Sequence, residues 1–183
     1  MLILASKSPR RQQILRDSGI PFVMRPADVP ELRRPNESPA DYVQRLAEEK
    51  AFAVTMAPGE VVLGADTVVV VDGQVLEKPR HASDAMRMLE LLSGREHEVI
   101  TGICLRSDAR KIVDIASTRV HFVALTREEM EAYVASGEPM DKAGGYAIQG
   151  LAARFVDRVD GSYSNVVGLP VALVYRRLRE IEP

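Results

Sequence analysis

Apolar and polar residues follow two spacings along the chain, one typical of strands and one typical of helices. Near-continuous or alternating apolar runs of the strand type occupy residues 2–5, 61–71, 74–79, 97–106, 112–125 and 153–159. Segments with helical spacing begin after Ser8, Ser38, Ser83, Thr126 and Pro170. Residues 22–35 are rich in proline and charge, which predicts an irregular connection.

Strands and helices interleave, as in an α/β protein. The dipeptide Asp72-Gly73 lies between two strand segments and is a strong signal for a two-residue hairpin turn. Some neighbouring strands should therefore be antiparallel, which predicts a mixed β-sheet with flanking helices. No repeat or linker divides the chain, so we expect a single domain over residues 1–183.

The hairpin also predicts a strand register. Counting outward from the turn pairs Val71 with Gln74 and Val69 with Leu76. The next pair on the same face would be Thr67 with Lys78, which brings Lys78 beside Asp66. In an ideal ladder Asp66 and Lys78 lie on opposite faces, so a bulge or a strand end must intervene if both serve one site.

Two arginines follow a predicted helix start. The Ser8 oxygen can cap a helix, and the fixed φ of Pro9 suits the first helical position. Arg10 and Arg11 then lie at the positive end of the helix dipole, where cations cost stability. Exposed arginines that reach into water are one explanation. The other is an anion site, in which free N–H groups, the Ser6 and Ser8 hydroxyls and the guanidinium groups bind phosphate oxygens.

Lys50 interrupts the apolar face of the helix that begins after Ser38. Its neighbours on that face are Val43, Leu46, Ala47 and Val54. The ammonium group can escape to water while the stem packs. Alternatively it points into a cleft, where an anionic ligand compensates its charge.

Asp66 raises the same question in a strand. It lies within VVLGADTVVVV, a run typical of a strand buried on both faces. A buried carboxylate is costly unless it is paired, hydrogen-bonded or bound to a metal. Burial against Arg or Lys is one explanation. Its own strand offers no obvious cation partner, which favours a metal-binding or catalytic role.

Charge and cysteine content narrow the class of protein. The net charge of -2 gives no global basic field for nucleic acid, so any polyanion site must be local. Cys104 is the only cysteine and lies in an apolar run, which predicts a buried thiol and suits a reducing cytosol. No apolar stretch is long enough for a signal peptide or a membrane span, and we expect a soluble cytoplasmic protein.

Two weaker candidates remain. His81, His97 and His121 have no metal-ligand spacing, so we assign them no role. The glycine-rich segment DKAGGYAIQG, residues 141–150, could be an ordinary connection. Its polar residues, Asp141, Lys142 and Gln149, surround small residues that let the backbone approach a ligand closely.

Five segments together resemble the Maf family of nucleoside triphosphate pyrophosphatases. In order they are SKSPRR, GADTVVVVDGQVLEKP, LSGREHEVITG, DKAGGYAIQG and GSYSNVVGLP, and they span nearly the whole chain. The resemblance implies an α/β fold related to the inosine-triphosphatase group, of the Maf and Ham1 type, with two lobes around a cleft. It also implies metal-dependent hydrolysis of a nucleoside triphosphate to the monophosphate and pyrophosphate.

The resemblance assigns roles residue by residue. The catalytic base of the family corresponds to Asp66, and Asp66 with Glu31 would hold Mg²⁺ or Mn²⁺. Further catalytic positions fall on Glu31, Lys50 and Lys78. Substrate-binding positions fall on Ser8, Arg10, Arg11, Thr67 and Gln149. Pro30 stands before Glu31 where an acid is common, which weakens the case for a second metal ligand there.

Substrate choice follows from the same resemblance. Arg10, Thr67 and Gln149 match positions that mark the branch acting on dTTP and UTP. The sequence YAIQG replaces the usual YGIQG, with Gly145 before it. Two other functions stay open: a nucleotide-sensing regulator of septum formation without turnover, and a phosphatase acting on monoesters. A homodimer is left open as well.

Overall fold

The computed structural model describes residues 1–181 and contains two compact units. The first unit comprises residues 1–67 and 101–116 and the segment from Gly168 onward, and the second comprises residues 68–100 and 117–167. The last two residues of the expected domain, 182 and 183, lie outside the described residues. The single domain and the cleft between two lobes stay predictions.

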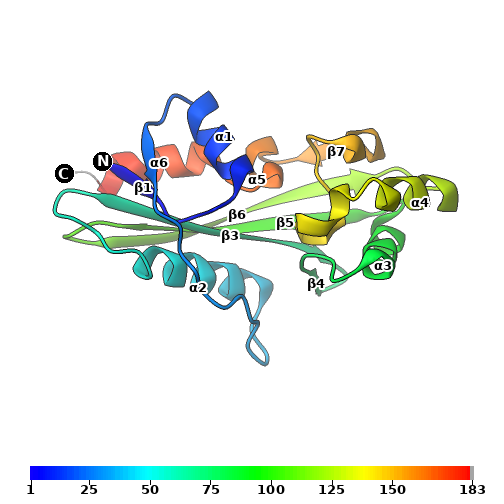
Figure 1. Cartoon of the computed structure of the whole chain (residues 1–183), viewed down its shortest axis with the longest axis horizontal. Coiled ribbons are helices and arrows are strands. Elements are labelled where there is room, and N and C mark those ends of the chain that lie inside the picture. Colours follow the sequence, from blue (N-terminus) through cyan, green and yellow to red (C-terminus); the bar gives the residue numbers. More distant parts are fainter. Residues whose placement is uncertain (182–183) are drawn as a thin grey trace. The chain divides into compact units, whose positions relative to one another are not determined.

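Residues 1–181 contain a seven-stranded mixed sheet, which confirms the predicted fold class (Figure 1). The strand order is β2-β1-β3-β5-β6-β7, and β4 pairs with β3. β1 runs parallel to both β2 and β3, whereas the β3–β4 and β6–β7 pairs are antiparallel. The strands are β1 (Leu2–Leu4), β2 (Phe22–Met24), β3 (Val61–Val71), β4 (Gln74–Leu76), β5 (Glu96–Arg106), β6 (Lys111–Phe122) and β7 (Val156–Asp160).

The first unit has helices on both faces of its part of the sheet. α1 (Pro9–Asp17) and α6 (Val171–Ile181) lie on one face, and α2 (Pro39–Phe52) lies on the other (Figure 1). Ser8 and Ser38 cap α1 and α2 as predicted, each accepting a hydrogen bond from a backbone N–H of the first turn.

Two glycines let α2 lie unusually close to the sheet. A Cβ added at Gly64 would come within 2.0 Å of the Ala47 carbonyl oxygen, and one at Gly102 within 2.4 Å of the Val43 oxygen. Side chains at these positions would push α2 away from β3 and β5. The Cys104 thiol packs in the same layer, and burial raises its pKa to about 12, which confirms the predicted buried thiol.

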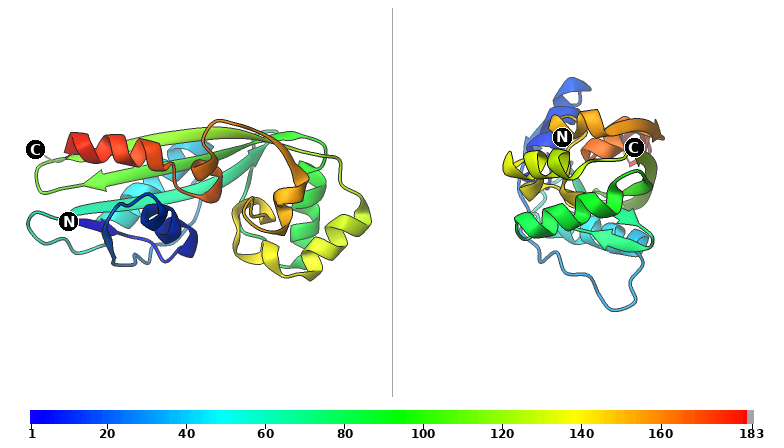
Figure 2. Two further views of the ribbon diagram at one scale, coloured as in Figure 1. Left: turned by 90° about the horizontal axis from the view of Figure 1, so that it is seen from above. Right: turned by 90° about the vertical axis from the view of Figure 1, so that its right-hand side faces the viewer.

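The second unit contains α3 (Ala82–Leu92), α4 (Arg127–Ala135) and α5 (Tyr163–Val167), and α3 packs against α4 (Figure 2). Three short 3₁₀ helices, Glu138–Asp141, Ala143–Gly145 and Leu151–Phe155, follow α4. Thr126 and Glu129 form the capping box at the start of α4. The Asp72-Gly73 turn has positive φ at both residues, and the pairs Val71–Gln74 and Val69–Leu76 are confirmed.

Four expectations need correction. The ladder ends at Leu76, so Lys78 lies in a bend beyond the sheet and does not extend the register to Thr67. Residues 22–24 pair with β1, so the segment 22–35 is not wholly irregular. His81, not Ser83, caps α3, because its Nδ1 accepts a hydrogen bond from the Asp84 N–H at 3.1 Å. Residues 153–155 belong to the 3₁₀ helix Leu151–Phe155, not to a strand, and the N–H of Leu151 at its start donates to Glu138 at 3.0 Å.

Within residues 1–181, no helix combines the length and the apolar character needed to cross a membrane.

Candidate active site

A buried ion pair between Asp66 and Lys50 lies at the centre of the candidate site. The Nζ of Lys50 on α2 donates a hydrogen bond to Oδ1 of Asp66 on β3 at 2.6 Å. Only 10% of either side chain is exposed. Gly64 lies two residues before Asp66 and therefore on the same face of β3, so the close approach of α2 at Gly64 is what brings Lys50 within reach.

Glu31 reaches the same lysine from the irregular segment after β2. Its Oε1 accepts a second hydrogen bond from Lys50 Nζ, also at 2.6 Å. Its side chain is 42% exposed, in contrast to that of Asp66. One ammonium group therefore holds two carboxylates together, one buried and one partly in water.

Burial shifts the protonation equilibrium of Asp66. Desolvation raises the pKa of this carboxyl above its ordinary value, while the charges of Lys50 and Arg11 oppose the shift. The raised pKa makes Asp66 a better proton acceptor than an exposed aspartate. This is the property that a general base requires.

Arg11 is a buried cation whose hydrogen bonds end on neutral oxygens. Its Nε donates to the Gly168 carbonyl at 2.8 Å, its Nη1 to the Ser6 hydroxyl at 3.3 Å and its Nη2 to the Thr67 hydroxyl at 3.1 Å. Burial lowers its pKa, and the charges of Asp66 and Glu31 oppose that change. A buried guanidinium with neutral acceptors favours the arrival of an anion.

The start of α1 is as polar as the sequence predicted. Ser8 Oγ accepts the N–H of Arg11 at 3.4 Å, and Ser6 Oγ accepts the N–H of Ser8 at 3.2 Å. Arg10 lies half-buried in the first turn, which contains no acidic residue. Both serine hydroxyls thus already accept backbone hydrogen bonds.

Thr67 lies in a hydroxyl network that sequence reasoning missed. Its Oγ1 lies 2.9 Å from the Thr101 Oγ1 and 3.3 Å from the carbonyl oxygen of Gly168. Together with the Arg11 contact, these bonds fix the guanidinium in place. Thr101 and Gly168 lie in two of the segments that carry the family resemblance, LSGREHEVITG and GSYSNVVGLP, but no pattern along the chain assigned either residue a role.

Lys78 and Gln149 belong to the second unit, where both are exposed. The turn that carries Gln149 has a defined shape, because the Glu138 carboxylate accepts bonds from the Tyr133 hydroxyl and the Leu151 N–H. A Cβ at Gly150 would come within 2.4 Å of that carboxylate, so a side chain there would displace Glu138. Roles for Lys78 and Gln149 in the site stay predictions.

The donor set at Lys50 fits a divalent metal that arrives with phosphate. Asp66 and Glu31 offer oxygens close enough to share one ammonium, and Mg²⁺ is commonly held by one or two carboxylates together with substrate phosphates. Among residues 1–181, no group of three or more His, Cys, Asp or Glu side chains could hold a metal ion. The residues therefore do not form a complete metal cage of their own.

Comparison of the whole fold defines the class of protein. The chain has the fold of the Ham1 protein of Staphylococcus aureus, with a TM-score of 0.56 at 12% identity over 98% of both chains. A HAM1 protein from Coxiella burnetii gives a TM-score of 0.50 at 16% identity, again over 98% of both chains. The predicted relation to this fold group is confirmed.

Comparison of sequences then identifies the family. The model of the family described as Maf-like protein matches residues 1–181, and the chain belongs to this Maf family. A relative from Koribacter versatilis, named dTTP/UTP pyrophosphatase, is 51% identical over 97% of this chain and 93% of its own. Relatives with the same name from Anaeromyxobacter dehalogenans and Symbiobacterium thermophilum are each 53% identical, over 97% and 93% of this chain and 92% and 88% of their own.

Proposed function

We propose that this protein hydrolyses dTTP and UTP to the nucleoside monophosphate and pyrophosphate. The relatives that are about half identical over almost the whole chain carry the name of this activity. The observation that carries the proposal is the buried Asp66, held by Lys50 with Arg11 close enough to influence its pKa. This arrangement combines a proton acceptor with cations for a polyphosphate.

Asp66 acts as the general base. A water molecule gives a proton to the Asp66 carboxylate as its oxygen attacks the α-phosphorus. The bond between that phosphorus and the oxygen bridging to the β-phosphorus breaks, and the electron pair leaves with pyrophosphate. The raised pKa of Asp66 suits this task, because a base is most effective when its pKa lies near the working pH.

Cations of the site neutralise the triphosphate. Arg11 can exchange its neutral acceptors for phosphate oxygens, which form stronger, charge-assisted bonds. Arg10 lies in the same helical turn, and Lys50 and Lys78 add further positive charge. Charge builds up on the departing pyrophosphate, so fixed cations lower the barrier.

A divalent metal, Mg²⁺ or Mn²⁺, is part of the proposal. Asp66 and Glu31 would hold it together with phosphate oxygens. When bound, it would supply Lewis-acid polarisation of the phosphate. Lys50, which bonds to both carboxylates in the structure, compensates part of their charge without the metal.

Base selection is assigned to Arg10, Thr67 and Gln149. Gln149 offers both a donor and an acceptor, which match the alternating carbonyl and N–H edge of uracil or thymine. The Thr67 hydroxyl bonds to Arg11, Thr101 and Gly168, which favours an effect on the substrate through Arg11. A cytoplasmic location belongs to the same proposal and is consistent with the free, buried thiol of Cys104.

Product analysis tests the proposal. The purified protein is incubated with dTTP or UTP and Mg²⁺ or Mn²⁺, and the products are separated by chromatography. We expect monophosphate and pyrophosphate. Diphosphate and orthophosphate would contradict the cleaved bond, and nucleotide binding without turnover would favour the sensing function instead. A pure sensor needs the cations but has no use for a buried carboxylate, which is why Asp66 favours the enzyme.

A further inference from the structure

The apolar contact of the segment that carries Glu31 lies before that residue, where Ala27 packs against the core. Residues 30–36 are all exposed, and even the side chain of Leu32 is left 73% exposed. The bond from Lys50 to Glu31 cannot fix the segment by itself, because the Glu31 side chain is 42% exposed and ion pairs in contact with water contribute little. The exposed chain that follows Glu31 therefore needs an anchor of its own.

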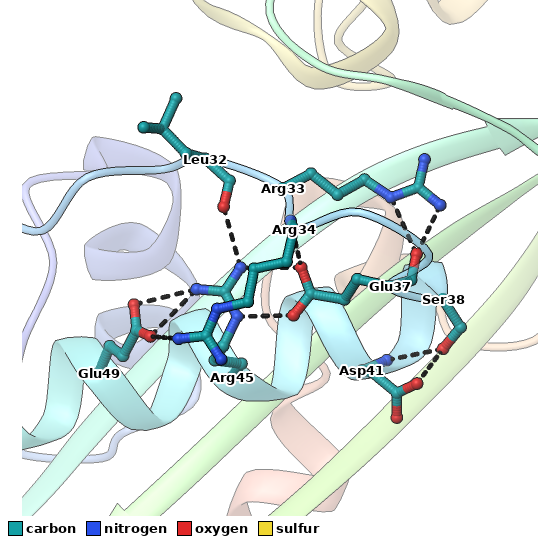
Figure 3. A network of polar contacts seen from close by, with 8 residues as sticks. All are labelled: Leu32, Arg33, Arg34, Glu37, Ser38, Asp41, Arg45 and Glu49. Atoms are coloured by element: carbon teal, nitrogen blue, oxygen red, sulfur yellow. Dashed lines mark hydrogen bonds and ion pairs between the residues drawn. The ribbon is translucent and has the colours of Figure 1, made fainter.

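All three guanidinium nitrogens of Arg45 on α2 donate hydrogen bonds, and two of them, Nε and Nη2, bind this segment (Figure 3). Nε and Nη2 donate to the two carboxylate oxygens of Glu37, at 2.6 and 2.8 Å. Nη2 also donates to the backbone oxygen of Leu32, the residue after Glu31, at 2.9 Å. Nη1 donates to Glu49 on the same helix at 3.0 Å, which fixes the orientation of the guanidinium.

Burial makes this contact stronger than a surface ion pair. The Glu37 side chain is only 8% exposed and that of Arg45 16%. The guanidinium also lies over the ring of Tyr42, 5.5 Å from its centroid. The bond from Arg45 lowers the pKa of Glu37 to about 2, so both groups stay charged over the whole working range.

Glu37 in turn organises the turn before α2. Its carboxylate accepts the N–H of Arg34 at 2.9 Å, and its backbone oxygen accepts the Nε of Arg33 at 3.0 Å (Figure 3). Arg34 also reaches Glu49 at 3.2 Å. These bonds therefore tie residues 32–37, the part of the segment that follows Glu31, to α2.

Two successive turns of α2 thus bind neighbouring residues of the segment. Lys50 binds the side chain of Glu31, and Arg45 binds the backbone oxygen of Leu32. We propose that Arg45 is a positioning residue, which acts with Glu37 to hold the carboxylate of Glu31 beside Lys50 and Asp66. The role of Glu31 in turnover rests on the proposed function, whereas the anchoring of the segment does not.

Limited proteolysis tests the anchoring without using activity. Trypsin can cut the exposed bond between Arg33 and Arg34, and the cleavage rate follows the population of the detached segment. We expect Arg45→Met to raise that rate about tenfold or more. Glu37→Gln should act in the same direction and serves if Arg45→Met does not fold. The control is Lys111→Met, which removes a cation that pairs with Glu48 on α2 but does not touch the segment.

Kinetics test the link to Glu31. A small displacement of a reacting group can cost up to ~100-fold in rate, and we expect Arg45→Met to lower kcat/KM by about 10- to 100-fold. In a Glu31→Gln background the same substitution should cost less than about twofold, because the group that it positions is already lost. A merely structural role would give equal losses in both backgrounds.

The outcomes separate the two proposals. Unchanged cleavage after Arg33, an equal rise at sites throughout the chain, or additive kinetic losses would each overturn the role of Arg45. If the unmodified protein hydrolyses no nucleoside triphosphate, the proposed function fails, while the proteolysis still decides whether Arg45 anchors the segment.

Discussion

Lys50 Nζ lies 2.6 Å from Oδ1 of Asp66, and both groups are buried. Each charge therefore compensates the desolvation of the other. Each also depends on the other, since removing one partner leaves an isolated charge in the core. The chemistry that we assign to Asp66 and the stability of the first unit are linked through this pair.

Lys50→Met tests that dependence. The substitution keeps the apolar stem and deletes the ammonium, which leaves the Asp66 carboxylate without its buried partner. Breaking a buried pair in this way costs about 3–5 kcal/mol. We expect a lower free energy of unfolding in urea titrations at neutral pH, together with reduced turnover. An unchanged or higher free energy of unfolding would show that the pair does not stabilise the protein.

The double variant Lys50→Met/Asp66→Asn is the control for that experiment. It removes both charges and should recover part of the stability lost in Lys50→Met. If the single and double variants are equally stable, the stability lost in Lys50→Met comes from altered packing and not from the unpaired carboxylate.

The pH dependence of turnover tests the protonation state of Asp66. Burial raises its pKa, and the base must be ionised to accept a proton. The acid limb of kcat/KM should therefore lie above the ordinary aspartate pKa of about 3.9. The free energy of unfolding changes in the opposite direction to activity. Folding raises the pKa of this carboxyl, so its protonated form stabilises the folded protein at low pH, and that stabilisation is lost as the pH rises through the folded pKa. An acid limb at or below pH ~3.9 would contradict the assignment.

Thr67→Val separates the support of Arg11 from the chemistry at Asp66. The substitution keeps the shape but removes an acceptor of the Arg11 Nη2, and a buried donor left without a partner costs about 1–3 kcal/mol. We expect reduced thermal stability and a higher KM for dTTP. Thr67→Ser keeps the hydroxyl and is the matched control. If the two variants have the same thermal stability and the same KM, the Thr67 hydroxyl does not support Arg11.

Gln149→Glu tests base selection. The change removes the amide donor, and a site that relies on such bonds discriminates strongly against ligands that leave them unmade. We expect the native protein to use dTTP and UTP with kcat/KM within about tenfold of each other, because one methyl group is worth only about 1–3 kcal/mol. CTP should be poorer, and Gln149→Glu should lose that discrimination before it loses hydrolysis. A native preference for CTP or a guanine nucleotide would exclude the assigned residues from base recognition.

The parts of the fold that local chemistry determines could be predicted from the sequence. The helix starts at Ser8 and Ser38 and the turn at Asp72-Gly73 depend on neighbouring residues, and all three are confirmed. The three-residue strand β2 was missed because its pairing with β1 is a non-local contact. The 3₁₀ helix at residues 151–155 was missed as well, and the partner of its first N–H, Glu138, lies in another segment.

The site was predictable to a similar extent. Burial of Asp66 followed from the apolar residues around it and is confirmed. For Lys50 the sequence left two explanations, and its burial argues against an ammonium group that escapes to water. Their bond to each other did not follow, because it depends on how closely α2 approaches Gly64. The supports of Arg11 at Thr101 and Gly168 come from distant segments, and the role of Arg45 becomes visible only when its contacts are known.

The most direct test of the account is the turnover of Asp66→Asn compared with the unmodified protein, measured as dTMP and pyrophosphate formed from dTTP with Mg²⁺ or Mn²⁺. The variant keeps the shape of the side chain and removes the base, and general-base catalysis typically contributes about 10²–10⁴-fold. The exposed Asp160 on β7 provides the control variant, Asp160→Asn. We predict a loss of at least about 100-fold for Asp66→Asn and none for Asp160→Asn, whereas near-normal turnover of Asp66→Asn would show that Asp66 has a structural role only.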